Sequence, residues 1–174
     1  MSNTSSKRTV FMSGVGGIGM SALAQLLAER GEVVTGSDRE ESPTTRLLES
    51  RGIKVMIGQT RENVPGQADI LVYSAAVHTD NPERMRATEL GIPQVSYFEM
   101  LGSVSEQKRT IAVAGTHGKT TTTGMLAKIL RDAGVSPSAV VGSIVQDFGS
   151  NYLSGESDWF VVEACEYQRH FLNL

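Results

Sequence analysis

The chain has 174 residues, which is enough for one domain or two modest ones, and its apolar content of 40% suffices for a packed core. A net charge of −3, a pI near 5.6 and 6% aromatic residues exclude the basic, base-stacking surface of a nucleic-acid-binding protein. A single cysteine excludes an internal disulfide, and no apolar stretch reaches the roughly 18 residues that a membrane span needs. We therefore expect a cytoplasmic protein that binds neither nucleic acid nor membrane. The sequence carries no signal for an oligomeric state.

The first motif is a glycine-rich turn near the N-terminus. Residues 1–8 are polar and predict a disordered tail, and residues 9–13 predict a buried strand. A G-x-G-x-x-G turn follows, and then a helix that Gly31 ends, with one apolar face made by Met20, Leu23, Ala24 and Leu27. Such glycines allow a tight turn, close approach of a diphosphate and close helix packing. The expected diphosphate-binding residues are Gly14, Gly16, Gly17, Ile18 and Gly19.

Alternating strands and helices continue to about residue 104. A strand over 32–36 ends in Ser37 and Asp38, and Asp38 lies 19 residues past Gly19, where an acidic residue meets a ribose hydroxyl. The small-residue turn that begins at Ser74 and Ala75 follows a strand and should line the same crevice. Further strands are predicted at 54–57, 69–73 and 94–97, and helices at 43–50, from Asn81–Pro82 to Gly91, and at 98–104. This alternation predicts an α/β, Rossmann-like, doubly wound parallel sheet over residues 9–104, with the polar stretch 103–108 as its boundary.

The second motif is a phosphate loop. A strand over 110–114 enters a turn with Gly115 and Gly118, and a helix follows at once. Backbone N–H groups and the helix N-terminus suit nucleotide phosphates; Lys119 would neutralise the β/γ oxygens and Thr120 would bind Mg²⁺. Val113 stands where the usual loop has its first glycine, so this is a tighter form of the motif. The expected ATP-binding residues are Gly115, Thr116, His117, Gly118, Lys119, Thr120 and Thr121.

A carboxylate completes this second site. Strands are predicted at 139–145 and 159–164, joined by the glycine- and serine-rich connection 147–158. Glu163 ends the last strand, where a carboxylate completes the Mg²⁺ shell of phosphate-loop enzymes; Glu166 is a weaker candidate. We therefore predict Lys119 and Glu163 as catalytic residues, with Thr120 and Glu163 as metal ligands. Residues 105–174 look like the start of a phosphate-loop ATPase domain that cannot cover both faces of its sheet, so we expect an incomplete domain.

Together these motifs make the chain similar to the N-terminal part of the Mur ligase family. The resemblance rests on GVGGIGMSALA, TGSD, AGTHGKTTT, the G-x-N-x-x-x-G of residues 149–155, and VVEACE, in which Cys165 replaces the usual aspartate. It implies that the first domain holds UDP-N-acetylmuramate, with Ser37 and Asp38 near the uridine or sugar, and that the second holds ATP. The substrate carboxylate would become an acyl phosphate, which the amine of L-alanine would attack. The string Gly-Gly-Ile-Gly-Met-Ser favours alanine-adding enzymes over the related ligases that recycle murein peptides.

Two other functions stay open at this point. A nicotinamide-dependent oxidoreductase would explain the first turn and Asp38 but not the phosphate loop. A non-catalytic UDP-sugar-binding module would explain a chain that stops inside its second domain, and we expect the 174 residues to be inactive alone. His117 has two interpretations: a residue that contacts the γ-phosphate or the substrate carboxylate, or a loop residue that fills space. Arg169 and His170 fit a solvated turn better than a sugar contact.

Overall fold

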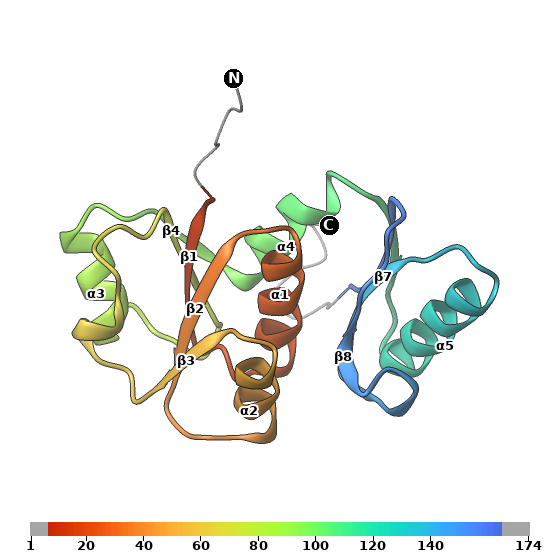
Figure 1. Ribbon diagram of the computed structural model, residues 1–174, viewed down its shortest axis with the longest axis horizontal. Coiled ribbons are helices and arrows are strands. Elements are labelled where there is room, and N and C mark those ends of the chain that lie inside the picture. The colour runs from red at the N-terminus through yellow and green to blue at the C-terminus, as the bar shows by residue number, and fades with distance from the viewer. Residues whose placement is uncertain (1–6, 165–174) are drawn as a thin grey trace.

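The computed structural model describes residues 7–164. The expectations for the first six residues, and for Cys165, Glu166, Arg169 and His170, fall outside this range. Within it the chain forms two sheets (Figure 1). None of the helices in the described range is long and apolar enough to cross a membrane.

The first sheet is parallel and has five strands in the order β3-β2-β1-β4-β5. Its strands are β1 (Thr9–Ser13), β2 (Val33–Asp38), β3 (Lys54–Ile57), β4 (Ile70–Tyr73) and β5 (Gln94–Ser96). Its helices are α1 (Ile18–Glu29), α2 (Pro43–Ser50), α3 (Pro82–Glu89) and α4 (Tyr97–Ser105), with a 3-10 turn η1 (Arg61–Asn63). The predicted doubly wound fold is confirmed. The strand order reverses between β1 and β4, and open sheets of this kind bind ligands at the carboxyl ends of such strands.

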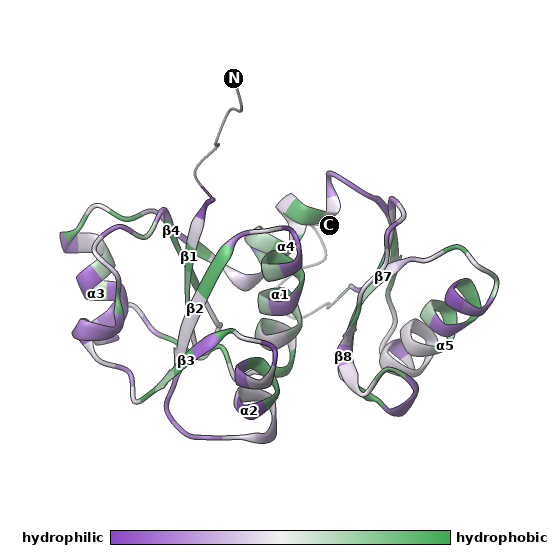
Figure 2. Cartoon of the chain, viewed as in Figure 1, coloured by the Kyte–Doolittle hydropathy of each residue, from purple (hydrophilic) through white to green (hydrophobic). Residues whose placement is uncertain are grey.

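Helices cover both faces of this sheet, as Figure 1 shows: α3 lies on one side, and α1, α2 and α4 lie on the other. Alternation along β1 serves both layers, because Phe11 packs with Leu71 and Ala87 on the α3 side, whereas Val10 and Met12 join the larger core around α1. Figure 2 shows that α3 is mostly hydrophilic, and only Glu83 and Ala87 of that helix are buried.

The last helix of the first sheet, α4, differs from its prediction. The predicted strand over 94–97 ends one residue early, because the Ser96 side chain accepts a hydrogen bond from the Glu99 N–H and caps α4. The helix then runs on to Ser105, since Val104 and Ser105 are buried. The polar stretch 103–108, predicted as a boundary, is therefore helical in its first half.

The second sheet has four strands in the order β6-β9-β7-β8. Its elements are β6 (Arg109–Val113), α5 (Lys119–Asp132), β7 (Ser138–Val145), a 3-10 turn η2 (Gln146–Phe148), β8 (Ser150–Leu153) and β9 (Trp159–Glu163). Strands β6, β9 and β7 are parallel, whereas β8 runs antiparallel to β7. The prediction of a plain connection over 147–158 is wrong, because this stretch contains β8. Its Ser150 and Asn151 are fully buried against another element, which local polarity does not reveal.

That other element is α1, which lies between the two sheets (Figure 1). Alternate residues of β7 face different helices: Val140 belongs to the core around α1, whereas Ala139 and Val141 pack with Ala127 of α5. Every residue of α1 from Met20 to Leu27 is buried, as expected for a helix covered on more than one side. Of the described residues after 105, only α5 covers this sheet, as expected, and α1 of the first sheet covers its other face.

Candidate functional site

The glycine-rich turn joins β1 to α1. Gly14 has φ +80°, a conformation that residues with side chains rarely adopt, and its N–H and that of Val15 both donate to the Ser37 carbonyl at 2.9 Å. Gly17 precedes α1 and no side chain caps the helix. The N–H groups of its first turn, together with the helix dipole, are therefore suited to an anionic ligand.

The Asp38 carboxylate lies against this turn. One of its oxygens accepts a hydrogen bond from the Gly16 N–H at 2.8 Å, and the other accepts one from the Arg39 N–H at 2.7 Å. A Cβ atom added at Gly16 would lie 2.8 Å from that carboxylate, so the glycine makes room for Asp38. The Ser37 side chain, expected near the uridine or sugar, is instead fully buried and donates to Glu83 at 2.7 Å. It therefore lies beneath the crevice, not in its lining.

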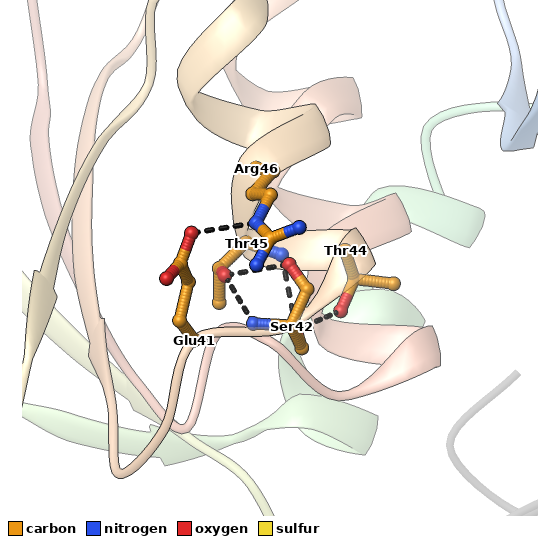
Figure 3. Close-up of polar contacts among 5 residues, drawn as sticks. All are labelled: Glu41, Ser42, Thr44, Thr45 and Arg46. Atoms are coloured by element: carbon orange, nitrogen blue, oxygen red, sulfur yellow. Dashed lines mark hydrogen bonds and ion pairs between the residues drawn. The ribbon is translucent and has the colours of Figure 1, made fainter.

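A cavity of about 450 Å³ opens beside the turn. Its wall carries the carboxylates of Asp38, Glu40 and Glu41 as well as Arg39. Arg46 pairs with Glu41 at 2.6 Å, and this hydrogen bond holds the pKa of the Glu41 carboxyl below its usual value (Figure 3). The wall is thus rich in hydrogen-bond acceptors. The full lining is Gly14, Gly16, Gly17, Asp38, Arg39, Glu40, Glu41, Ser42, Gln59, Ser74, Ala76 and Val77.

The start of α2 closes one side of this cavity. Figure 3 shows that Ser42 and Thr45 cap the helix reciprocally: the Thr45 N–H donates to Ser42 Oγ at 3.2 Å, and the Ser42 N–H donates to Thr45 Oγ1 at 2.8 Å. The Thr44 hydroxyl donates to the Gly16 carbonyl. The cavity wall and the glycine-rich turn are therefore joined by direct hydrogen bonds.

The remaining residues predicted for the first site divide into two groups. Ser74 lines the cavity and packs closely on Gly14, since a Cβ there would lie 3.0 Å from the Ser74 Cβ. Ala75 is exposed and lies outside the lining, although Ala76 and Val77 of the same turn are part of it. Ile18 and Gly19 also lie outside this cavity.

The phosphate loop between β6 and α5 has two glycines in conformations that favour glycine. Gly115 has φ +142° and Gly118 has φ +77°, directly before the first residue of α5. The Lys119 ammonium group turns back over the loop and donates to the Gly115 carbonyl at 2.5 Å. Of the predicted ATP-binding residues, the exposed ones are Thr116, His117, Gly118 and Thr121.

Thr120 and Glu163, the predicted metal ligands, lie side by side. The Thr120 hydroxyl donates to one Glu163 carboxylate oxygen at 3.1 Å, and the Gly142 N–H of β7 donates to the other at 2.6 Å. Gly142 was not predicted, yet a Cβ there would lie 2.7 Å from the carboxylate. Its sequence signal is only a glycine inside an apolar strand, which marks a close approach.

The chemistry of this pair fits Mg²⁺. The ion takes oxygen ligands at 2.0–2.1 Å in an octahedron, which places neighbouring oxygens about 2.9 Å apart. The 3.1 Å between Thr120 Oγ1 and Glu163 Oε2 matches that separation. Among residues 7–164 no three histidine, cysteine, aspartate or glutamate side chains gather as a metal cluster. Phosphate oxygens and water would therefore complete the shell, as is usual for nucleotide-bound Mg²⁺.

A second cavity, of about 180 Å³, lies between residues of the first helix and residues of the second sheet. Its lining includes Gly19 from the first turn of α1, Gly142 and Glu163 from the second sheet, and Tyr97 and Phe98 from α4. Gly19 makes room for an aromatic ring, because a Cβ there would lie 2.7 Å from the Tyr97 ring. Gly19 of α1 and Glu163, one of the two predicted metal ligands, thus border one space.

Beneath the first cavity lies a polar network that sequence reasoning missed. The fully buried Glu83 carboxylate accepts hydrogen bonds from Ser13 at 2.5 Å, from Ser37 at 2.7 Å and from Asn63 at 2.9 Å. The Ser13 hydroxyl in turn accepts one from Gln59, which lines the cavity. The only sequence signal was Asn81–Pro82, interpreted as a helix start, and it gave no reason to place Glu83 under the site.

Comparison with known proteins decides the family. A sequence profile described as the Mur ligase family, catalytic domain, matches residues 9–109, more than half of the chain. The chain belongs to the Mur ligase family. This Mur ligase chain is 51% identical over 166 residues to the UDP-N-acetylmuramate–L-alanine ligase of Novosphingobium aromaticivorans. It is 46% identical over 165 residues to the ligase of the same name from Caldicellulosiruptor saccharolyticus.

Solved Mur ligases share the arrangement of both sheets. The UDP-N-acetylmuramate-alanine ligase of Thermotoga maritima superposes with a TM-score of 0.81 at 32% identity, over 90% of this chain and 37% of that one. A ligase titled UDP-N-acetylmuramate:L-alanyl-gamma-D-glutamyl-meso-diaminopimelate ligase, from Neisseria meningitides, gives a TM-score of 0.84 at 31% identity, over 93% and 54% of the two chains. The two matches to the curated relatives cover 95% and 94% of this chain but only 35% and 36% of the relatives. The chain therefore spans about a third of their length.

Proposed function

We propose that this chain is the substrate- and ATP-binding part of a ligase that joins L-alanine to UDP-N-acetylmuramate. Residues 9–104 would form the sugar-nucleotide domain, and residues 105–174 would begin the ATP-binding domain. The observation that carries the proposal is the 180 Å³ cavity, because both Gly19 of α1 and Glu163 of β9 line it. An acid held at the first helix and a phosphoryl group held at the second loop would meet there.

The sugar nucleotide would lie across the 450 Å³ cavity. Its diphosphate is best placed at the N-terminus of α1, where uncapped N–H groups stabilise negative charge. The acidic wall suits the other end of the ligand, because carboxylates such as Asp38 and Glu40 accept hydrogen bonds from ribose and uracil but repel phosphate. The charge distribution therefore orients the ligand.

The activation step would use the phosphate loop. A carboxylate oxygen of the substrate attacks the γ-phosphorus, ADP leaves, and an acyl phosphate results; the alanine amine then displaces inorganic phosphate and loses a proton. Lys119 would neutralise the phosphate oxygens, while Thr120 and Glu163 would hold the cation. Bound Mg²⁺ would screen the repulsion between the two anions.

Ligand-dependent stability tests this assignment on the 174-residue chain itself. A ligand present at 100 times its Kd stabilises a protein by about 2.7 kcal/mol, or roughly 5–11 °C in Tm for a chain of this size. We expect such shifts with UDP-N-acetylmuramate and, separately, with Mg·ATP. A shift with NAD and none with UDP-N-acetylmuramate would instead support the oxidoreductase, and a shift with the sugar nucleotide alone would support the non-catalytic module.

A matched pair of lysine variants tests the division between the two ligands. Lys119→Ala should weaken Mg·ATP binding about tenfold to a hundredfold, since a charge-assisted hydrogen bond contributes about 1.5–3 kcal/mol. Its affinity for UDP-N-acetylmuramate should not change. The control, Lys128→Ala, removes a cation of the same helix that pairs with Asp132 and Asp147. Calorimetry showing that Lys119→Ala loses both ligands would contradict separate sites.

The related ligases that recycle murein peptides are the second candidate, because the structure titled for such an enzyme superposes as well as the alanine ligase does. Both would pass the UDP-N-acetylmuramate test. The names of the curated relatives at 46–51% identity favour alanine. In an enzyme of full relative length, phosphate release that needs a tripeptide and not L-alanine would reverse this choice.

A further inference from the structure

Strand β8 lies against α1 through polar side chains, not only through apolar ones. Ser21 and Gln25 of α1 and Ser150 and Asn151 of β8 are between 0% and 2% exposed. Burying polar groups at such an interface is costly unless every one of them is hydrogen-bonded. These four residues come from opposite ends of the chain, more than 120 positions apart.

The two amide side chains satisfy each other and their surroundings. Asn151 Nδ2 donates to the Ile18 carbonyl at 2.5 Å and to the Ser21 hydroxyl at 2.9 Å. Gln25 Nε2 donates to Asn151 Oδ1 at 3.1 Å and to the Ser21 carbonyl at 2.9 Å. The Ser150 hydroxyl donates to Gln25 Oε1 at 3.1 Å. All four amide N–H donors are used, so the geometry of the pair is closely determined.

The position of this amide pair connects the two halves of the candidate site. Ile18 is the first residue of α1, adjacent to the turn that would hold the diphosphate. On the other side, β8 pairs with β7, where Tyr152 lies opposite Val140, and two residues further along β7 the Gly142 N–H holds the Glu163 carboxylate. Hydrogen bonds, joined by short stretches of the β8 and β7 backbone, therefore connect the first turn of α1 to the predicted metal ligand.

We propose that Asn151 is a positioning residue and that the Asn151–Gln25 pair, here called the amide latch, fixes the second sheet relative to the first turn of α1. The latch sets the separation between the sugar-nucleotide turn and the Thr120–Glu163 pair. Its role in catalysis rests on the proposed function, whereas its effect on geometry does not. Phosphoryl transfer depends on alignment, so a small displacement of one site against the other lowers the rate.

Distances between spin labels measure this effect directly. In a Cys165→Ser background, labels at Met85→Cys on α3 and Met125→Cys on α5 span α1 from both sides (Figure 1), and both positions are exposed, at 47% and 60%. The parent chain should give one narrow distance distribution. Asn151→Leu should broaden it and shift its mean.

Two further variants separate positioning from stability. Gln25→Leu/Asn151→Leu replaces both amides together, which restores packing without directional bonds and keeps the chain folded if the single variant unfolds. It should be more stable than Asn151→Leu, although the buried Ser150 hydroxyl loses its acceptors, and should retain the broad distribution. The control, Tyr152→Phe, removes a bond from the same strand to the opposite end of α1, the 2.9 Å contact with Glu29, and should leave the distribution narrow.

Either of two results would overturn the latch. A parental distribution in the double leucine variant would show that packing alone positions the sheets. Equal broadening in Tyr152→Phe would assign the effect to the whole interface and not to the amides. The measurement needs no ligand, so its failure would count against the latch, whereas failure of the proposed function would appear in the UDP-N-acetylmuramate and Mg·ATP titrations.

Discussion

Glu83 provides the sharpest test of how the floor of the first cavity is built. Glu83→Ala removes the acceptor of the Ser13 and Ser37 hydroxyls in a space that is fully buried, whereas Asn63 keeps a second bond to the Gly58 carbonyl at 2.7 Å. Each buried donor left without a partner costs about 1–3 kcal/mol, so with the cavity created we expect a loss of about 3–5 kcal/mol. For a chain of this length that corresponds to a fall in Tm of roughly 6–20 °C.

Glu83→Gln should be far milder, at about 1 kcal/mol, because the hydroxyls of Ser13 and Ser37 can rotate and accept from the new amide. Urea unfolding followed by circular dichroism gives both values, with Glu89→Gln as the control, since Glu89 makes only exposed ion pairs with Arg61 and Arg86. Equal losses for Glu83→Ala and Glu83→Gln would refute the reasoning, because charge and not hydrogen bonding would then hold the network. A loss below about 1 kcal/mol for Glu83→Ala would refute it too.

Two other substitutions test a close packing contact at Gly19 and the burial of the Glu32 carboxyl. Gly19→Ala places a Cβ 2.7 Å from the Tyr97 ring and should lower the free energy of unfolding in urea by about 1–3 kcal/mol. The double variant Gly19→Ala/Tyr97→Leu should recover this stability. Gly66→Ala is the control, because a Cβ there meets nothing within 4 Å. Burial raises the pKa of the Glu32 carboxyl above its unfolded value of 4.5, so folding favours the protonated carboxyl. The stability that the protonated Glu32 contributes is therefore fully present below pH 4.5 and is lost as pH rises through the higher folded pKa. Glu32→Gln should therefore raise Tm at pH 7 and not below pH 4.5; an unchanged Tm at pH 7 would contradict this.

Much of the first sheet was predictable because its signals are local. The ranges predicted for β1, β3 and α2 agree with the structure to the residue, since each apolar run or helix is bounded by glycine, proline or a capping side chain. The phosphate loop was predictable for the same reason, because a strand, a turn and a helix follow directly in sequence, and Glu163 was predictable as a carboxylate at the end of an apolar strand. Their assignment as ligand-binding residues stays a proposal.

What could not be predicted depends on partners far apart in sequence. Glu83 lies 70 residues from Ser13 and 46 from Ser37, and no period or motif relates them. Asn151 belongs to a motif that carried the family resemblance, yet nothing in its neighbourhood shows that its amide binds Ile18, 133 residues away. Strand β8 was missed for the same reason, because its polar residues are buried by packing against α1, which its own sequence pattern does not indicate.

The helix α1 explains why the two sheets have to be understood together. Its predicted apolar face consists of Met20, Leu23, Ala24 and Leu27, and this prediction gave no reason for Ala22, Gln25 and Leu26 to be buried as well. All of these residues are buried, because the second sheet packs on the opposite side. The N-terminus of α1 suits an anion, and the second sheet packs on the same helix. The position of α1 therefore links the substrate site to the phosphate loop. Without the second sheet, the first sheet would expose an apolar face of α1. The stability of the first sheet therefore depends on residues that follow the phosphate loop.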